Sequence, residues 1–295
     1  WFCGNQLPTH PPSSPSSASC RPDGTCYLVM LGVSDLLFAA VVVIVSTFIA
    51  SSNISASALS VSPFQTDRAA RKNANKTRSY RRQAQRLTRR QREVLRKHAH
   101  EFRPPEKNLL WDMDGDIGLD IGFGKGDSLL ALSRSFDDLQ WVGIEVYKPG
   151  VAQAIDMLST LGDREEENTP RIACMDAMTA LYDKVPKNSV SMATVLYPDP
   201  SMAKERLLIR PLFVGLLEGV FGATGGRLHI TTDDQEYASH VENVFRIAED
   251  RGWAGGKVDR PSWRPSTEYE LRALAEGRQP VDFCFSYKLD SQNSS

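Results

Sequence analysis

Hydrophobic and polar residues alternate between strand-like and helix-like patterns from about Leu109 to the end of the chain. Short apolar runs, typical of buried strands, occupy residues 117–123, 141–146, 171–175, 190–196, 227–232 and 281–289. Helical spacing between them predicts helices at residues 128–136, 150–161, 210–221 and 237–251. Strands separated by helices of this length form right-handed crossover units, so we expect an α/β domain with a mostly parallel sheet over residues 108–290.

The N-terminal part of the chain lacks this pattern. Residues 1–29 are rich in Pro and Ser and are expected to be disordered or to precede the true start at Met30. Residues 27–50 carry a single charge, and the small residues that follow favour a signal peptide over 30–58, with a retained membrane anchor as the alternative. The acid-poor stretch behind it resembles a plastid transit segment. We therefore expect an organellar, plastid destination, or a membrane-anchored protein if the apolar stretch is kept.

Charge is concentrated between the leader and the α/β domain. Residues 68–107 contain fifteen Lys and Arg against three acids. This excess favours binding to a polyanion and marks residues 59–107 as a basic transit or linker segment that also contacts nucleic acid. Residues 88–98 are expected to form a helix with Thr88 as its N-cap. The five cysteines form no CxxC pair or Cys/His cluster, so no metal site is expected, and residues 291–295 are a short tail.

A glycine-rich segment follows the first predicted strand and precedes the first predicted helix. Gly122, Gly124 and Gly126 allow a tight turn and a close approach of the backbone to a ligand. Asp120 stands directly before them, where a carboxylate would repel the pyrophosphate of a dinucleotide. S-adenosylmethionine carries an ammonium and a sulfonium and no phosphate, so this arrangement favours S-adenosylmethionine as the cofactor.

Three further acids follow the carboxyl ends of predicted strands. Glu145 ends the second strand about twenty residues after the glycines, where a carboxylate accepts hydrogen bonds from ribose hydroxyls. Asp176 follows the third strand and is expected to reach the adenine edge. Asp199 lies between two prolines after the fourth strand, and these prolines restrict its backbone. Ligands of open α/β sheets bind outside these strand ends, so the three acids are expected to share one pocket.

Several motifs together resemble those of the bacterial-type, single-subunit tRNA (guanine-N7)-methyltransferases. They are Leu-Asp-Ile-Gly-Phe-Gly-Lys-Gly, Gly-Ile-Glu-Val-Tyr-Lys-Pro-Gly-Val, Pro-Asp-Pro, Ile-Thr-Thr-Asp-Asp-Gln-Glu-Tyr-Ala and Arg-Pro-Ser-Thr-Glu-Tyr-Glu, within residues 78–289. The resemblance implies a Rossmann-like class I fold with a seven-stranded sheet and helices on both faces. It also implies methylation of N7 of guanine 46 in the variable loop of tRNA, by a monomer that needs no partner subunit.

The same resemblance assigns roles to individual residues. Asp120, Glu145, Asp176 and Asp199 would line the cofactor pocket with the three glycines, and Asp199 would also be the catalytic residue. The residues expected to face the guanine or its tRNA are Lys204, Asp233, Thr267, Tyr269 and Glu270.

The chain departs from the family pattern mainly in the substrate half. Asp120 replaces a Glu, which is a mild change, whereas Glu268 stands where the family has Lys. Residues 201–206 are shorter and less basic than usual, and residues 277–282 lack a Gly-His pair and a Trp. Two alternatives therefore stay open: a methyltransferase of the same fold with another substrate, and a catalytically weak RNA-binding protein.

Overall fold

The computed structural model describes residues 86–161, 168–201 and 206–288. These residues belong to the second of two compact units, which spans Thr66–Ser295. The expected leader, including the apolar stretch at residues 27–50, lies outside the described residues. Within the described ranges, none of the helices has the length and apolar character needed to cross a membrane.

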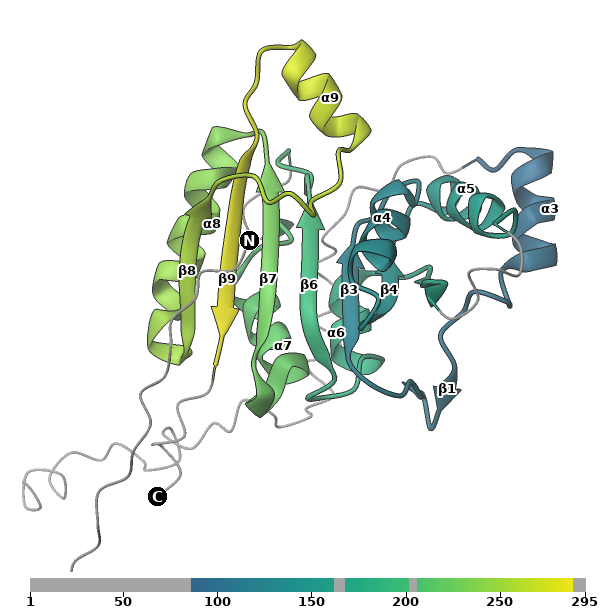
Figure 1. Cartoon of the computed structure of the whole chain (residues 1–295), viewed down its shortest axis with the longest axis horizontal. Helices are drawn as coiled ribbons and strands as arrows, with labels where there is room; N and C mark the ends of the chain where they lie inside the picture. The colour runs from purple at the N-terminus through teal and green to yellow at the C-terminus, as the bar shows by residue number, and fades with distance from the viewer. Residues whose placement is uncertain (1–85, 162–167, 202–205, 289–295) are drawn as a thin grey trace, which may run out of the picture. The chain divides into compact units, whose positions relative to one another are not determined.

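A seven-stranded sheet forms the centre of the domain (Figure 1). In spatial order its strands are β5 (Arg171–Ala173), β4 (Gln140–Ile144), β3 (Ile117–Ile121), β6 (Val190–Leu196), β7 (Gly226–Thr232), β9 (Val281–Tyr287) and β8 (Trp253–Val258). The first five strands pair in parallel, and β9 is antiparallel to both neighbours. The order reverses direction at β3, where the chain crosses from the β4–β5 side to the β6 side. The predicted mostly parallel, seven-stranded α/β sheet is confirmed.

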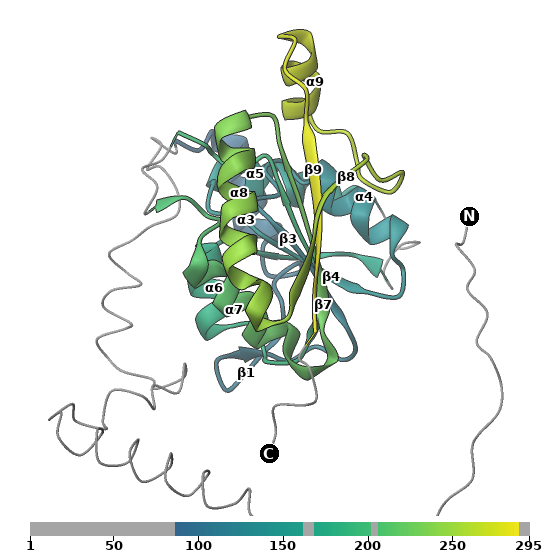
Figure 2. The ribbon, with the colours of Figure 1, turned by 90° about the vertical axis from the view of Figure 1, so that its left-hand side faces the viewer.

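Helices cover both faces of the sheet, as expected. One apolar cluster joins the sheet to α6 (Ala177–Asp183), α7 (Pro211–Phe221) and α8 (Gln235–Ala248). A second cluster joins the opposite face to α4 (Asp127–Ser135) and α5 (Lys148–Leu158). Figure 2 shows α6, α7 and α8 on one side of the sheet and α4 on the other. Strand β3 is buried along its whole length, so only the loop after its carboxyl end is accessible to a ligand.

Several elements of the domain do not appear in the sequence-based expectation. Strand β8 contains Gly255 and Gly256, which are poor strand formers, and it pairs only with β9 at the sheet edge. Helix α6 has seven residues, too few for a clear helical period. Helix α9 (Glu268–Ala275) buries only two residues and projects beyond the carboxyl ends of β6 and β7 (Figure 1). A small hairpin, β1 (Glu106–Lys107) and β2 (Leu110–Trp111), and two 3-10 turns, η4 (Gly222–Thr224) and η5 (Glu249–Arg251), complete the fold.

The predicted basic helix is present as α3 (Arg89–His98). Thr88 caps it: the Thr88 side chain accepts from the Gln91 N–H, and the Gln91 side chain accepts from the Thr88 N–H. The helix packs beside α5, where the Arg90 guanidinium lies 2.7 Å from the Asp156 carboxylate. A basic helix is therefore held against the same α5 whose N-terminus adjoins the glycine-rich loop.

Candidate active site

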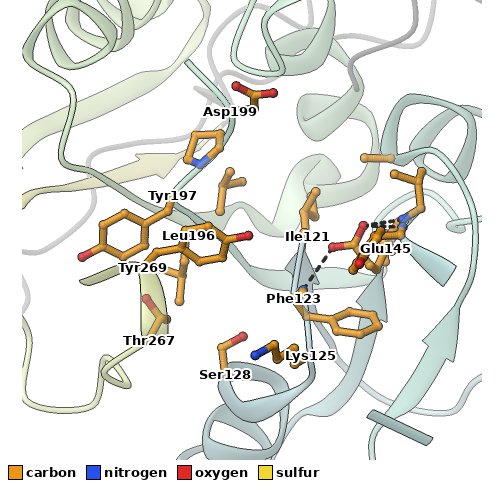
Figure 3. Close-up of a pocket in the computed structure, with 18 of the residues that line it drawn as sticks. Ile121, Phe123, Lys125, Ser128, Glu145, Leu196, Tyr197, Asp199, Thr267 and Tyr269 are labelled. Atoms are coloured by element: carbon orange, nitrogen blue, oxygen red, sulfur yellow. Dashed lines mark hydrogen bonds between the residues drawn. The ribbon is translucent and has the colours of Figure 1, made fainter. Parts of the chain in front are cut away.

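A cleft of about 480 Å³ opens at the carboxyl ends of β3, β4 and β6 (Figure 3). Pockets for small ligands in α/β proteins occur at such strand ends and have volumes of about 300–1,000 Å³. One wall consists of the glycine-rich loop, Glu145 and Asp176, and the other of residues 195–199 and the first turn of α9. The cleft therefore brings together the three acids that the sequence placed after separate strands.

Two of the three glycines face the cleft. Gly122 and Gly124 have φ angles of +83° and +62°, and a side chain added at either would meet open space. Gly126 has a different task, because a Cβ there would lie 2.6 Å from the Cβ of Ala154 in α5. Gly126 does not line the cleft as expected; it lets α4 and α5 approach closely.

Glu145 holds the loop from the end of β4. Its Oε2 accepts the Gly124 N–H at 3.0 Å, and its Oε1 accepts the N–H groups of Val146 and Tyr147 at 2.6 and 2.8 Å. These bonds fix the carboxylate on the cleft wall, as the dashed lines in Figure 3 show. A carboxylate held in this way presents its remaining lone pairs to a ligand in the cleft.

Asp120 lies beneath the glycine-rich loop and not on the cleft wall. Its side chain is buried and accepts hydrogen bonds from Ser128 Oγ at 2.7 Å and Thr194 Oγ1 at 2.9 Å. Burial raises the pKa of this carboxyl to about 6, against the lowering effect of the two hydroxyl groups. Asp120 is therefore not part of the cleft lining, although its buried carboxyl group lies beneath the loop that forms the cleft wall.

The other two acids lie on the cleft wall. Asp176 is the N-cap of α6 and accepts the Thr179 N–H at 3.1 Å. Asp199 Oδ1 accepts the Ser201 N–H at 2.9 Å and a bond from the Ser201 hydroxyl. Both carboxylates are thus oriented by the chain just after them.

Tyr197 makes an unusual turn between β6 and Asp199. Its φ of +54° is rare for a residue with a side chain, and its N–H donates to the Thr231 carbonyl in β7 at 2.8 Å. Burial, followed by the nearby Glu270, raises the pKa of the phenol, so it stays protonated. A strained backbone conformation of this kind persists where surrounding contacts enforce it. The turn at Tyr197 places Pro198 and Asp199 in the cleft lining.

The residues expected to face the substrate divide into two groups. Thr267, the N-cap of α9, and Tyr269, which is 59% exposed, both line the cleft. The rings of Tyr269 and Tyr197 are nearly parallel, with centroids 6.4 Å apart. Lys204 lies outside the described residues.

Two expected substrate contacts are paired with arginines and do not line the cleft. Glu270 is buried, and both of its carboxylate oxygens accept bonds from Arg264, at 2.7 and 3.0 Å. Asp233 pairs with Arg278 and does not line the cleft. The sequence motif could not distinguish an acid that faces RNA from one that is paired with an arginine of the same chain.

Sequence comparison identifies the family. A family model described as "Putative methyltransferase" matches residues 114–283, more than half of the chain. The chain is 32% identical over 224 residues to a tRNA (guanine-N(7)-)-methyltransferase of Aeromonas hydrophila, covering 71% of this chain and 92% of that protein. It is also 32% identical over 228 residues to the Photorhabdus laumondii enzyme of the same name, covering 71% and 91%. The chain belongs to the tRNA (guanine-N7)-methyltransferase family. The enzyme class that the motifs indicated is confirmed.

The structure also shows cleft residues that sequence reasoning missed. Lys125 and Arg272 line the cleft, and Lys125 Nζ lies 2.6 Å from Glu268 of α9. The position of Lys125 between two glycines of this loop could have indicated a cleft residue, because a loop lysine is not accommodated in the core. Arg264 stood inside a quoted motif, but nothing in the sequence indicated that it is buried. Among the described residues there is no group of three or more metal-binding side chains.

Proposed function

We propose that this chain transfers a methyl group from S-adenosylmethionine to N7 of a guanine in tRNA, at position 46 of the variable loop. The observation that carries the proposal is the cleft itself, which joins the loop held by Glu145 to Asp199 and the first turn of α9. The relatives named above provide the choice of tRNA and guanine N7.

The cleft residues fit S-adenosylmethionine. Gly122 and Gly124 leave the space that a close ligand needs, and Glu145 can accept from ribose hydroxyls. Asp176 lies on the same wall, where it can accept from an adenine amino group. Asp120 adds a buried negative charge beneath a ligand that carries a sulfonium and an ammonium.

The chemistry requires positioning more than proton transfer. When bound, S-adenosylmethionine supplies a methyl group that its sulfonium already activates. Guanine N7 carries a free lone pair, so no proton must be removed before it attacks. The task of the chain is then to align the two reactants. We assign Asp199 to accept hydrogen bonds from guanine N1–H and N2–H, and Tyr269 to border the base beside it.

Binding of tRNA is assigned mainly to phosphate contacts from the basic segment. Helix α3 exposes Arg89, Arg92 and Arg96 and carries no acid in its first turn. Such contacts give affinity without sequence selection, so recognition would depend on the shape of the tRNA. The protein is proposed to act as a monomer without a partner subunit.

A second candidate function is methylation of a different substrate. It is favoured by the ion pair between Lys125 and Glu268, because an acid replaces the family's lysine at the cleft mouth and neutralises the nearest loop cation. An acid there suits a less negatively charged substrate than RNA.

The test is incubation of the chain from residue 78 onward with labelled S-adenosylmethionine and bulk tRNA, followed by nucleoside analysis. Label in 7-methylguanosine supports the first function, and tRNA lacking G46 serves as the control. Cofactor binding without tRNA methylation would favour the second candidate. Absence of cofactor binding would leave an RNA-binding protein.

The destination in the cell is a separate proposal that rests on sequence alone. We infer that residues 30–58 are removed as a signal peptide and residues 59–77 as a transit segment, which would deliver the enzyme to a plastid-like organelle. N-terminal sequencing of the protein from its native cell, with carbonate extraction of membranes, tests this. A mature chain that retains residues 36–50 in the pellet would support the membrane-anchored alternative instead.

A further inference from the structure

A buried cluster of ionic side chains lies beneath α9. The Arg264 side chain is fully buried, and its two terminal nitrogens donate to the two oxygens of Glu270 at 3.0 and 2.7 Å. Its Nε lies 2.8 Å from Oδ1 of Asp282 in β9. Because a bidentate arginine–carboxylate pair fixes distance and orientation together, Glu270 has little freedom to turn toward the cleft.

The cluster continues into the sheet. Asp282 Oδ1 also accepts from Thr231 Oγ1 at 2.7 Å and contacts His229 Nε2 at 2.8 Å, both in β7. Burial raises the pKa of Asp282, but its bonds to His229 and Thr231, together with Arg264, leave it below the ordinary value. Helix α9 is therefore connected through Arg264 to two neighbouring strands of the sheet, β7 and β9.

The two acids in the first turn of α9 point in different directions. Glu268 reaches outward to Lys125 of the glycine-rich loop, and the side chains of this pair are 59% and 43% exposed. Glu270 reaches inward to Arg264, and its side chain is only 6% exposed. Exposed ion pairs contribute little, whereas removing one partner of a buried pair leaves an uncompensated charge. The inner acid should therefore hold the helix far more firmly than the outer one.

We propose that Glu270 is a positioning residue that acts through Arg264, and that this buried pair holds the Thr267–Tyr269 side of the cleft against Asp199. The proposal rests on the methyltransferase function proposed above. It replaces the expected contact between Glu270 and the substrate, because both carboxylate oxygens already have partners. Tyr269 and Thr267 face the cleft only while α9 keeps its place, so the pair controls alignment without touching the reactants.

The experiment compares three isosteric changes in the same chain. Glu270→Gln removes the inner charge, Glu268→Gln removes the outer one, and Glu242→Gln breaks an exposed pair with Lys257 away from the cleft. Hydrogen exchange of residues 268–275 is measured against that of β7, together with cofactor affinity and kcat and KM for tRNA. A fourth variant, Arg264→Lys, keeps the charge but loses the bidentate geometry.

For Glu270→Gln we expect at least tenfold faster exchange in α9, at least a tenfold loss of kcat, and cofactor affinity within threefold of wild type. Arg264→Lys should lie between Glu270→Gln and wild type. Glu268→Gln should change exchange in α9 by less than threefold, and Glu242→Gln should match the wild type in both exchange and kcat. Loss of tRNA affinity in Glu270→Gln with unchanged exchange in α9 would overturn the proposal, because it would mean direct contact with the substrate.

Misfolding of Glu270→Gln and absence of tRNA methylation can each be distinguished from failure of the proposal. If Glu270→Gln does not fold, Arg260→Gln replaces it, since Arg260 is half-exposed and donates only one bond to Glu270, at 3.1 Å. That variant should speed exchange in α9 by two- to threefold, and no change would count against the proposal. If the wild-type chain methylates no tRNA, the proposed function fails, yet the exchange measurements still show whether Glu270 holds α9.

Discussion

The two walls of the cleft are built by different kinds of interaction. On the cofactor wall, Glu145 accepts from three backbone N–H groups and Asp176 caps its own helix. On the α9 wall, the contacts join side chains distant in sequence, such as Lys125 with Glu268 and Arg264 with Asp282. The first wall is fixed mainly by local backbone geometry, and the second by charged pairs that long loops bring together.

Because of this difference, the two walls should tolerate amino-acid substitutions differently. A carboxylate bonded to the backbone keeps its partners whatever the neighbouring side chains are. An ion pair between side chains needs both residues, so a change at one position calls for a change at the other. Glu268 and Lys125 illustrate this: an acid stands where the family has Lys, and a loop lysine now lies against it. The cofactor wall should therefore be the more constant of the two.

The largest effect is expected at Asp199, on the same wall as α9. Asp199→Ala should lower kcat by about 10²-fold or more, because misaligned reactants lose that much even from small displacements. Cofactor affinity should stay within about tenfold of the wild type, because Asp199 is assigned mainly to the alignment of the guanine. Single-turnover methylation and calorimetry measure the two quantities. Near-full activity of the alanine variant would remove Asp199 from the catalytic assignment.

A somewhat smaller effect is expected on the cofactor wall. Glu145→Ala should weaken cofactor binding by about 1.5–3 kcal/mol, the value of hydrogen bonds to a charged group. Part of this loss comes from the loop, because Gly124 loses its acceptor. Glu145→Gln is the matched control, as it keeps an acceptor for the loop while losing the charge. Unchanged affinity by calorimetry in both variants would mean that the ribose is held elsewhere.

The sequence predicted most of the fold, because apolar runs and helical spacing are local signals. The strand at 190–196 and the N-cap at Thr88 agree with the structure at the residue level. Helix α9 was missed because only Glu270 and Ala273 of its residues are buried, which leaves no apolar face to detect. Strand β8 was missed because its two glycines and its mostly exposed residues leave no alternating apolar pattern to detect.

The candidate site could be predicted mainly where position along a strand determines it. Gly122, Gly124, Glu145, Asp176 and Asp199 all line the cleft as expected, because the carboxyl ends of parallel strands converge. The burial of Asp120 and Glu270, and the pairing of Asp233 with Arg278, depend on which hydroxyl or arginine lies opposite in space. That information is absent from the local sequence, so the side of the helix or strand that each acid faces could not be inferred.

On the tRNA side, α3 offers a test of phosphate binding. The triple change Arg89→Gln, Arg96→Gln and Lys97→Gln should reduce the slope of log affinity against log salt by about two to three, at roughly 0.7–0.9 per lost phosphate contact. Filter binding over a range of salt concentrations measures it. Lys257→Gln, on the edge strand β8, is the control and should leave the slope unchanged. An unaltered slope in the triple variant would restrict the basic segment to a transit or linker role.

The smallest effect is expected from the buried acid on the cofactor side. Burial raises the pKa of Asp120 to about 6, so the side chain is mostly negative at pH 7 and mostly neutral at pH 5 in the unliganded protein. A ligand with a sulfonium and an ammonium is attracted to the charged form, and binding must therefore favour ionisation. Affinity should fall as pH decreases through 6, by about three- to tenfold, the range for one screened charge several ångströms away.

The variant Asp120→Asn isolates this charge, because it preserves the size of the side chain beside Ser128 and Thr194. Its cofactor affinity should be nearly constant between pH 5 and 7 and close to that of the wild type at pH 5. Glu145→Gln provides the contrast, since its weaker binding should keep the pH dependence that Asp120 causes. If the Asn variant follows the wild-type pH profile, the dependence originates in another group, and the acid before the glycines has only a structural part in forming the loop.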